Sequence, residues 1–327
     1  RNPVGTGPFR MEHWVAGKEI VLVKNEDYYR GAPKIDRFVV KIVADDAAEA
    51  KALVDGTADL ARLSPRAAAP FEGKDGYRFY AMKTANFGAI LINCAHPYWQ
   101  SNRDLLPAIA YAVDRAAVIH EALLGHGIPA YSPLQRSPFN NPNVEHYDYN
   151  PAKAQEILEA AGYYTRGGEE VGFVLTVKND KRNRIDIANV VAAQMRAVGI
   201  HCTVETPAKV DWDGQMAYLS GVGNEIDPDA HTYKVFSTNG RGNDGHYSNP
   251  RVDEYLLAAR RATDTAERMR LYGLFQEEVT KDLPYIYICY LDFIYVTNTR
   301  VHGITPNRML GYNGVGFFWN VNEWTVD

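Results

Sequence analysis

The chain has 327 residues, of which 46% are hydrophobic, 35 are Lys or Arg and 40 are Asp or Glu, giving a formal net charge of −5. This length allows two lobes, because a single hydrophobic core stops growing at about 250–300 residues. A mildly acidic chain has no broad basic surface, so nucleic acid and anionic membranes are excluded as partners, and no run of about 18 apolar residues is present that could span a bilayer.

The first 95 residues read as a mixed sheet with one covering helix. Apolar runs alternate with turn residues, and residues 16–18 predict a hairpin turn between the first two strands. A helix is predicted over residues 45–54, with small apolar residues on one face and a stop at Asp55-Gly56. The predicted strands cover residues 9–14, 19–23, 37–43, 77–81 and 87–93.

Beyond His96-Pro97 the pattern changes to helices with clear caps. A helix over residues 184–198 lies between strands at 172–177 and 200–205, which predicts a βαβ unit with parallel strands. Asp264, followed by Glu267 three residues later, has the spacing of a capping box. Further helices are predicted at 104–113 and after Asp114, Asn150 and Asn249, and further strands at 285–290 and 293–298.

Catalytic and metal-binding motifs do not occur in the sequence. It has no GxSxG, HExxH, GxxxxGK[ST] or helix-opening GxGxxG pattern, and its nine histidines match no metal-ligand spacing. The three cysteines, Cys94, Cys202 and Cys289, lie in apolar runs without a CxxC spacing, which predicts buried thiols and leaves the redox compartment open. Neither a cofactor nor a metal is therefore expected.

One loop carries polar groups in a setting suited to binding. Asp227, Pro228 and Asp229 follow Gly221 and Gly223, and precede a helix predicted to start at His231. The two carboxylates could hold a cation or cap the helix, where negative charge is favoured, and the cap is the role we assign to Asp229. Whether Asn224 and Asp227 face a ligand stays open from the residues alone.

Ordered motifs along nearly the whole chain resemble a known family. They are Gly5-Thr6-Gly7-Pro8-Phe9, Asn25 to Asp36, Ala52 to Leu60, Ala110 to Arg115, Tyr149 to Ala154, Ala161-Gly162-Tyr163, Val198-Gly199-Ile200, Asp227-Pro228-Asp229 and Tyr247 to Asp253. In this order they resemble the bacterial extracytoplasmic solute-binding proteins of family 5, the oligopeptide, dipeptide and nickel type that serves ABC transporters.

This resemblance implies an α/β, periplasmic-binding-protein-like fold (type II, cluster C), with two lobes of mixed sheets and covering helices. The lobes are expected at residues 1–95 and 96–298, with residues 299–327 returning to the first lobe. Relatives carry additional strands and a small domain ahead of the Gly-Thr-Gly-Pro motif, so the first lobe is expected to be incomplete. Departures from the family are Leu106 and Pro107 ahead of the helix around residue 110, and a short segment at 204–215.

The implied function is non-catalytic. A peptide-like or other small solute would be captured between the lobes and delivered to ABC permease subunits by a monomer that is periplasmic, or extracellular and anchored to the membrane. The alternatives are a surface receptor or adhesin on the same scaffold, and a hydrolase that uses Asp227 or Asp229 with His231.

The resemblance also implies the place of the ligand site. In peptide binders of the family, an acidic residue three positions ahead of the Asp-Pro aspartate takes the peptide's amino terminus, and here that position is Asn224. A neutral amide supplies no charge, so the need for a free ammonium group is expected to be weak. The residues expected to face the ligand are Asn224, Asp227, Asp229, Tyr233 and Trp212.

Overall fold

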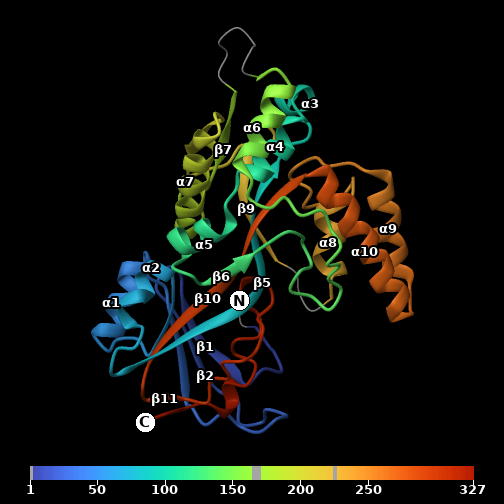
Figure 1. Ribbon diagram of the computed structural model, residues 1–327. Helices are drawn as coiled ribbons and strands as arrows, with labels where there is room; N and C mark the ends of the chain where they lie inside the picture. Colours follow the sequence, from blue (N-terminus) through green and yellow to red (C-terminus); the bar gives the residue numbers. More distant parts are fainter. Residues whose placement is uncertain (1–2, 164–170, 224–226) are drawn as a thin grey trace. The chain divides into compact units, whose positions relative to one another are not determined.

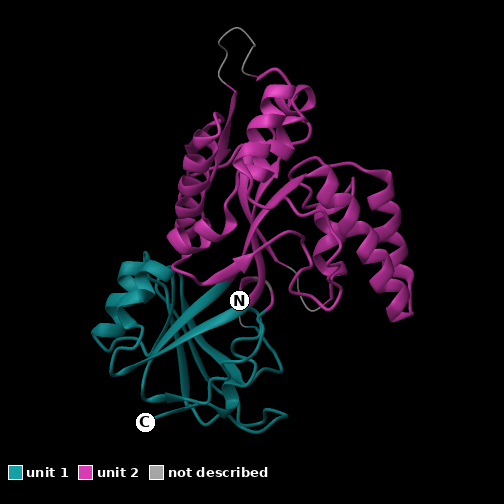
Figure 2. Cartoon of the chain, viewed as in Figure 1, with its two compact units in different colours: residues 1–83, 292–310, 314–327 teal, residues 84–291, 311–313 magenta. Residues whose placement is uncertain are grey.

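The computed structural model describes residues 3–163, 171–223 and 227–327 of the protein (Figure 1). The chain forms two compact units (Figure 2). Unit 1 comprises residues 1–83, 292–310 and 314–327, and unit 2 comprises residues 84–291 and 311–313. The unit boundaries fall inside two long strands, β5 (Tyr77–Ile92) and β10 (Tyr285–Asn298). The lobe boundaries drawn from the sequence stay predictions: residue 95 lies in the turn after β5, and residue 298 is the last residue of β10.

Unit 1 contains a three-stranded antiparallel sheet in the order β1-β2-β3. A second region contains β4, which pairs with the end of β10, and a short pair, β11 with β12. Two buried clusters fill the unit, one beneath α1 and α2 and one rich in aromatic rings from residues 293–324. The elements are β1 (Phe9–Val15), β2 (Glu19–Lys24), β3 (Arg37–Lys41), α1 (Asp46–Val54), β4 (Leu60–Leu63), α2 (Pro65–Ala68), β11 (Val301–His302) and β12 (Thr325–Val326).

Unit 2 is built on a mixed sheet covered by helices. Neighbouring strands run in the order β10-β5-β9-β7-β8, and β6 pairs with β10. Its remaining elements are α3 (Pro97–Ser101), α4 (Leu105–Ala112), α5 (Arg115–Leu123), β6 (Gly127–Pro129), α6 (Pro151–Ala160), β7 (Gly172–Thr176), α7 (Arg182–Ala197), β8 (His201–Glu205), β9 (Ala217–Gly223), α8 (Asp229–Phe236), α9 (Pro250–Arg261) and α10 (Thr265–Asp282).

The alternation of side chains along β5 separates two cores in this unit. Ile90 and Ile92 belong to one buried cluster, while Phe87, Ala89 and Leu91 belong to another, because successive residues of a strand point to opposite faces. Helices α4 to α7 contribute to the first core, and α8 to α10 contribute to the second. The sheet therefore carries one helical layer on each face (Figure 1).

Locally encoded elements form as the sequence predicts. β7 and β8 pair in parallel on either side of α7, which confirms the βαβ unit. The side chain of Asp264 accepts a hydrogen bond from the backbone N–H of Glu267, which confirms the cap of α10. The three cysteines are free thiols, two of them buried and Cys94 partly so.

Two strand predictions are wrong in the same way. The ranges 77–81 and 87–93 were expected as separate strands but form one strand, β5, and the ranges 285–290 and 293–298 likewise form β10. The interval between the two expected strands contains Thr84, whose hydroxyl is satisfied inside the sheet: Oγ1 donates to the carbonyl oxygen of Leu291 at 2.7 Å. Hydrogen bonding of this kind lets a polar residue continue a buried strand.

Candidate functional site

The segment that follows β9 connects this central strand of unit 2 to helix α8. Gly221 and Gly223 end the strand, and Asn224 lies outside the residues that the structure describes. The helix begins at Asp229, so the start predicted at His231 is two residues late. Asp229 is also not the cap, because it lies in the first turn, where its own backbone N–H donates to Asp227 Oδ1 at 2.9 Å.

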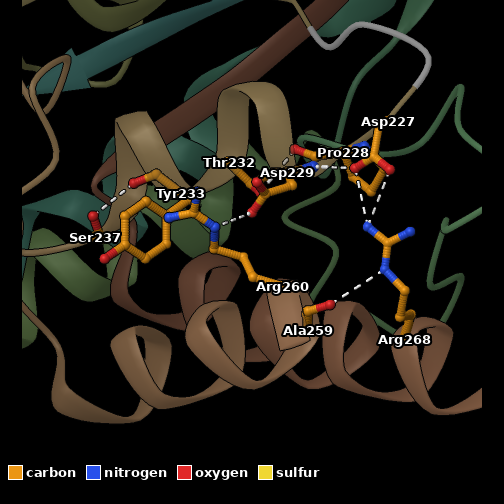
Figure 3. A network of polar contacts seen from close by, with 9 residues as sticks. All are labelled: Asp227, Pro228, Asp229, Thr232, Tyr233, Ser237, Ala259, Arg260 and Arg268. Atoms are coloured by element: carbon orange, nitrogen blue, oxygen red, sulfur yellow. Dashed lines mark hydrogen bonds and ion pairs between the residues drawn. The ribbon is translucent and has the colours of Figure 1, made fainter. Parts of the chain in front are cut away.

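Asp227 is held by an arginine from a distant helix (Figure 3). Arg268 of α10 donates from Nη2 to both carboxylate oxygens of Asp227, at 3.0 and 3.2 Å, and from Nε to the carbonyl oxygen of Ala259 at 3.2 Å. Partial burial raises the pKa of Asp227, but the hydrogen bonds from Arg268 and Asp229 outweigh it, so the net pKa lies below the ordinary value. Asp227 therefore acts as the anchor of this segment on the α9–α10 pair.

Asp229 and Tyr233 meet a second arginine, at the end of α9. Arg260 Nε lies 3.1 Å from Asp229 Oδ1, and its guanidinium carbon lies 4.1 Å from the centre of the Tyr233 ring. Burial, joined by the negative charge of Asp227, raises the pKa of Asp229, although Arg260 opposes the shift. In Figure 3 the Arg260 guanidinium lies over the Tyr233 ring, and the Asp229 carboxylate lies beside it, next to Nε.

Trp212 lies apart from this cluster in the sequence, in the loop between β8 and β9. Its side chain is 41% exposed and packs edge-to-face on Tyr218 of β9, with ring centres 4.9 Å apart. The loop is closed by a hydrogen bond from the Gly214 N–H to Asp211 Oδ1 at 3.2 Å. The Trp212 ring is therefore held by its packing on Tyr218 and remains partly exposed.

The structure thus brings together three of the five residues expected at the site, Asp227, Asp229 and Tyr233. It also adds Arg260 and Arg268, which the sequence reasoning missed. The available signal was local: Arg260 lies in the last turn of α9 and Arg268 in the first turn of α10, ahead of the buried Tyr272. Two neighbouring acidic residues that match no known catalytic or metal-binding motif are expected to pair with basic side chains such as these.

Two observations limit what the described parts of the chain can hold. Among those residues, no three His, Cys, Asp or Glu side chains gather closely enough to bind a metal ion. Over the same ranges, none of the helices combines the length and the apolar character needed to cross a membrane.

The Asp227–Arg268 contact predicts a measurable coupling. In a double-mutant cycle with Asp227→Asn and Arg268→Gln, we expect a coupling free energy of about 0.5–1 kcal/mol at pH 7, measured by urea unfolding. Because the folded-state pKa of Asp227 is lowered, this stabilisation is complete above the ordinary carboxyl pKa of about 4 and is lost as the pH falls through the lower folded-state value.

The control for this cycle is the exposed Glu267–Arg270 pair on the same helix, with Arg Nη2 2.8 Å from Glu Oε1. We expect its coupling to stay below about 0.5 kcal/mol. Equal couplings for the two pairs, or a coupling at Asp227 that does not decrease as the pH is lowered, would contradict the assigned role.

Comparisons with known proteins agree with this architecture. The model of "Bacterial extracellular solute-binding proteins, family 5 Middle" matches residues 1–243. Protein XP55 of Streptomyces lividans is 32% identical over 93% of this chain and 58% of its own length, and the oligopeptide-binding protein AppA of Bacillus subtilis is 25% identical over 99% of this chain and 62% of its own. The chain therefore spans about three fifths of the curated relatives it matches.

Solved structures show the same fold. NikZ from Campylobacter jejuni, in complex with Ni(L-His), superposes with a TM-score of 0.91 at 29% identity, over 99% of this chain and 69% of NikZ. AppA from Bacillus subtilis, in complex with a nonapeptide, gives a TM-score of 0.82 at 22% identity, over 98% of this chain and 66% of AppA. The α/β, periplasmic-binding-protein-like fold predicted from the sequence is confirmed.

Proposed function

Because the chain belongs to the bacterial extracellular solute-binding proteins of family 5, we propose that it captures a peptide-like or other small solute for an ABC import system. The match of the family model over residues 1–243 is the observation that carries this proposal. Two lobes would close around the solute and present it to permease subunits in the membrane, as hinge-closing binding proteins do. We further propose a monomer that works outside the cytoplasm, either in the periplasm or on the cell surface and anchored to the membrane.

The names of the relatives support a role in binding without fixing the solute. They include an oligopeptide-binding protein, glutathione-binding proteins and a heme-binding protein, and the solved neighbours hold Ni(L-His), peptides or agropinic acid. One scaffold thus serves chemically different solutes, so the solute has to be found from the residues that face it.

The contacts of the acidic residues favour binding over hydrolysis. A general base needs a free carboxylate poised near the working pH, whereas both oxygens of Asp227 accept hydrogen bonds and the net pKa of Asp227 is lowered. Asp229 is ion-paired with Arg260. We therefore assign these two residues to holding the segment in place, and propose no catalytic step.

Within this proposal the ligand site stays on residues 221–236, with Trp212 nearby in the sequence. Asp227, Asp229 and Tyr233 hold the start of α8 in place through their contacts with Arg260 and Arg268. Asn224 would contact the solute through its neutral amide, so ligands without a free ammonium terminus are expected to bind.

A panel of solutes tests the function. Peptides, amino acids, sugars and metal chelates are added to the chain at increasing concentration, and unfolding is followed by calorimetry. A true ligand at 100 times its Kd should add about 2.7 kcal/mol to the free energy of unfolding. Mass spectrometry should recover that ligand chemically unchanged. A panel without any stabilising solute, or a ligand recovered as hydrolysed products, would overturn the proposal.

Substitutions then locate the site. Asn224→Ala should weaken binding directly, whereas Asp227→Ala should weaken it by releasing the start of α8. Arg270→Ala, an exposed change on α10, serves as the matched control. Full binding by both site variants would show that the ligand contacts another part of the chain.

A further inference from the structure

Two of the passages of the chain between unit 1 and unit 2 lie inside the neighbouring strands β5 and β10. One falls between Lys83 and Thr84 of β5, and the other between Leu291 and Asp292 of β10. Within unit 2 the two boundary residues are in contact, because Thr84 Oγ1 donates to the carbonyl oxygen of Leu291 at 2.7 Å. We call Thr84, Asn86 and Leu291 the strand junction.

The hydrogen bonds of the strand junction involve side chains. In a regular antiparallel pair, backbone N–H groups donate directly to carbonyl oxygens of the facing strand. Here the carbonyl oxygen of Leu291 accepts from Thr84 Oγ1 and also from Arg136 Nη1, at 3.3 Å. The same Nη1 atom donates to the carbonyl oxygen of Thr84 at 3.0 Å, and the Asn86 N–H donates to Thr84 Oγ1 at 3.0 Å. Three backbone groups of the junction are therefore bonded to side chains.

This arrangement allows the two strands to twist at the junction. A side chain can follow a carbonyl group that moves, because its torsions rotate between several staggered positions. A buried carbonyl group that lost its donor would be costly, and Thr84 is 0% exposed, so water does not replace the donor there. Side-chain donors thus keep the carbonyl groups bonded while the backbone changes direction.

Arg136 reaches the junction from a firmly held loop, which follows β6. The Gln135 N–H donates to the hydroxyl oxygen of Tyr290 at 3.0 Å, and that hydroxyl donates to the carbonyl oxygen of Ser132, also at 3.0 Å. The Gln135 side chain donates to the carbonyl oxygen of Pro129 at 2.9 Å. The guanidinium carbon of Arg136 lies 5.6 Å from the centre of the Tyr290 ring. The base of the side chain is therefore fixed on β10, while its guanidinium bonds to both strands.

We propose that Arg136 is a positioning residue for solute capture: by donating to β5 and β10 at the strand junction, it limits how freely the two units move relative to each other. This inference rests on the proposed solute-binding function, in which two lobes close around a solute. Hinges are formed by a few residues that absorb changes in backbone angle, and here they would be residues 84–86 and 291. Without the guanidinium the carbonyl oxygen of Thr84 loses this donor, so the strands are expected to twist over a wider range.

The test measures the distribution of distances between the units by double electron–electron resonance. Spin labels are attached at Lys51→Cys on α1 and Glu254→Cys on α9, two exposed positions. Cys94, which is only partly buried, is replaced by Ser, and the other two native cysteines are buried. The measurement uses the whole 327-residue chain and needs no solute.

Four variants assign the effect. Arg136→Met is expected to widen the distance distribution about 1.5-fold or more, because methionine fills part of the volume but donates no hydrogen bond. Thr84→Val, which removes the hydroxyl and keeps the branched shape, is expected to widen it as well. Arg136→Lys keeps the charge but has no planar fork of donors, so an intermediate width is expected. The control, Arg196→Met, is an exposed change on α7 and should leave the width unchanged.

Urea unfolding of the same variants separates a positioning role from a purely structural one. A residue that only stabilises unit 2 would lower the unfolding midpoint and leave the distance distribution as it is in the parent chain. That result for Arg136→Met would overturn the proposal. An equal widening by Arg196→Met and Arg136→Met would overturn it too.

The two proposals can fail separately. A solute panel without any ligand would overturn the solute-binding function, while the distances still decide whether Arg136 restrains the strand junction. A solute that binds, together with a parent-like distribution for Arg136→Met, would overturn the role of Arg136 and leave the solute-binding function intact.

Discussion

Replacing Arg115 by Met is expected to lower the free energy of unfolding by about 3–5 kcal/mol, which is among the largest losses any single substitution in this chain should cause. Arg115, at the start of α5, is 5% exposed, and its guanidinium donates to four backbone carbonyl oxygens of the described residues. Nε bonds to Tyr287 at 2.9 Å and Ala130 at 3.1 Å, and Nη1 bonds to Tyr147 at 2.6 Å and Val113 at 3.4 Å.

These bonds join segments that are remote in the sequence. The side chain ties α5 to β10, to the chain after β6 and to the loop ahead of α6, and it also lies over the Tyr131 ring at 4.8 Å. Burial lowers the pKa of Arg115 to about 10, which still leaves it charged at neutral pH. Removing the guanidinium would strand several buried carbonyl groups at once, and methionine can fill the volume but donates no hydrogen bond.

Urea unfolding followed by circular dichroism measures the effect. Arg115→Lys keeps the charge but cannot span the same set of acceptors, so we expect it to recover less than half of the loss. Arg196→Met, an exposed change on α7, should alter stability by less than about 0.5 kcal/mol. A loss below 1 kcal/mol for Arg115→Met would show that the carbonyl groups find other donors.

The elements that could be predicted from the sequence are those formed by contacts between residues that are close in the sequence. The caps at Asp114, Asn150, Asn249 and Asp264 each accept a backbone N–H within three residues, and the sequence shows both partners side by side. The βαβ unit around α7 was predictable because its three elements follow one another within 34 residues, from Gly172 to Glu205. In such cases pattern and tertiary structure agree.

Features that depend on partners far along the chain were not predictable. The continuity of β5 through Thr84 depends on Leu291, which is 207 residues away. The arginine that holds Asp227 is 41 residues away. In the sequence, Arg115 stood out only as part of a family motif. Its structural role could not be predicted, because acceptors such as Tyr287 lie far from it in the sequence. Pairings over such distances follow from the packed fold, which local propensity does not encode.

The candidate site divides along the same line. The glycines and polar residues at 221–229 drew attention in the sequence, yet the sequence did not show that Asp227 and Asp229 are occupied by arginines. Arg184 belongs to no motif, and its position against Gly221 of β9 arises only from the packing of α7 on the sheet.

The C-terminal residues provide the second large stability prediction, because Trp324 is the buried centre of an aromatic cluster in unit 1. It is 2% exposed and packs edge-to-face on Phe317, with ring centres 5.6 Å apart. Its indole N–H donates to Asn320 Oδ1 at 2.9 Å, and the Asn320 amide donates to the carbonyl oxygen of Gly303. The Asn320 side chain therefore links Trp324, near the end of the chain, to Gly303 in the segment that follows β11.

Replacing Trp324 by Ala is expected to cost about 3–5 kcal/mol, since it removes a large buried ring, leaves a cavity and frees the Asn320 oxygen. Trp324→Phe should lose less stability, because the ring volume is largely kept and only the indole hydrogen bond is given up.

Hydrogen exchange should show lost protection in β11, in β12 and in residues 294–298 of β10. Helices α9 and α10 should stay protected, since they belong to a different buried cluster. Val315→Ala, at a position 62% exposed, is the control and should be neutral within about 0.5 kcal/mol. A loss below 1 kcal/mol for Trp324→Ala, or protection lost first in α9 and α10, would show that the C-terminal residues do not form part of the core of unit 1.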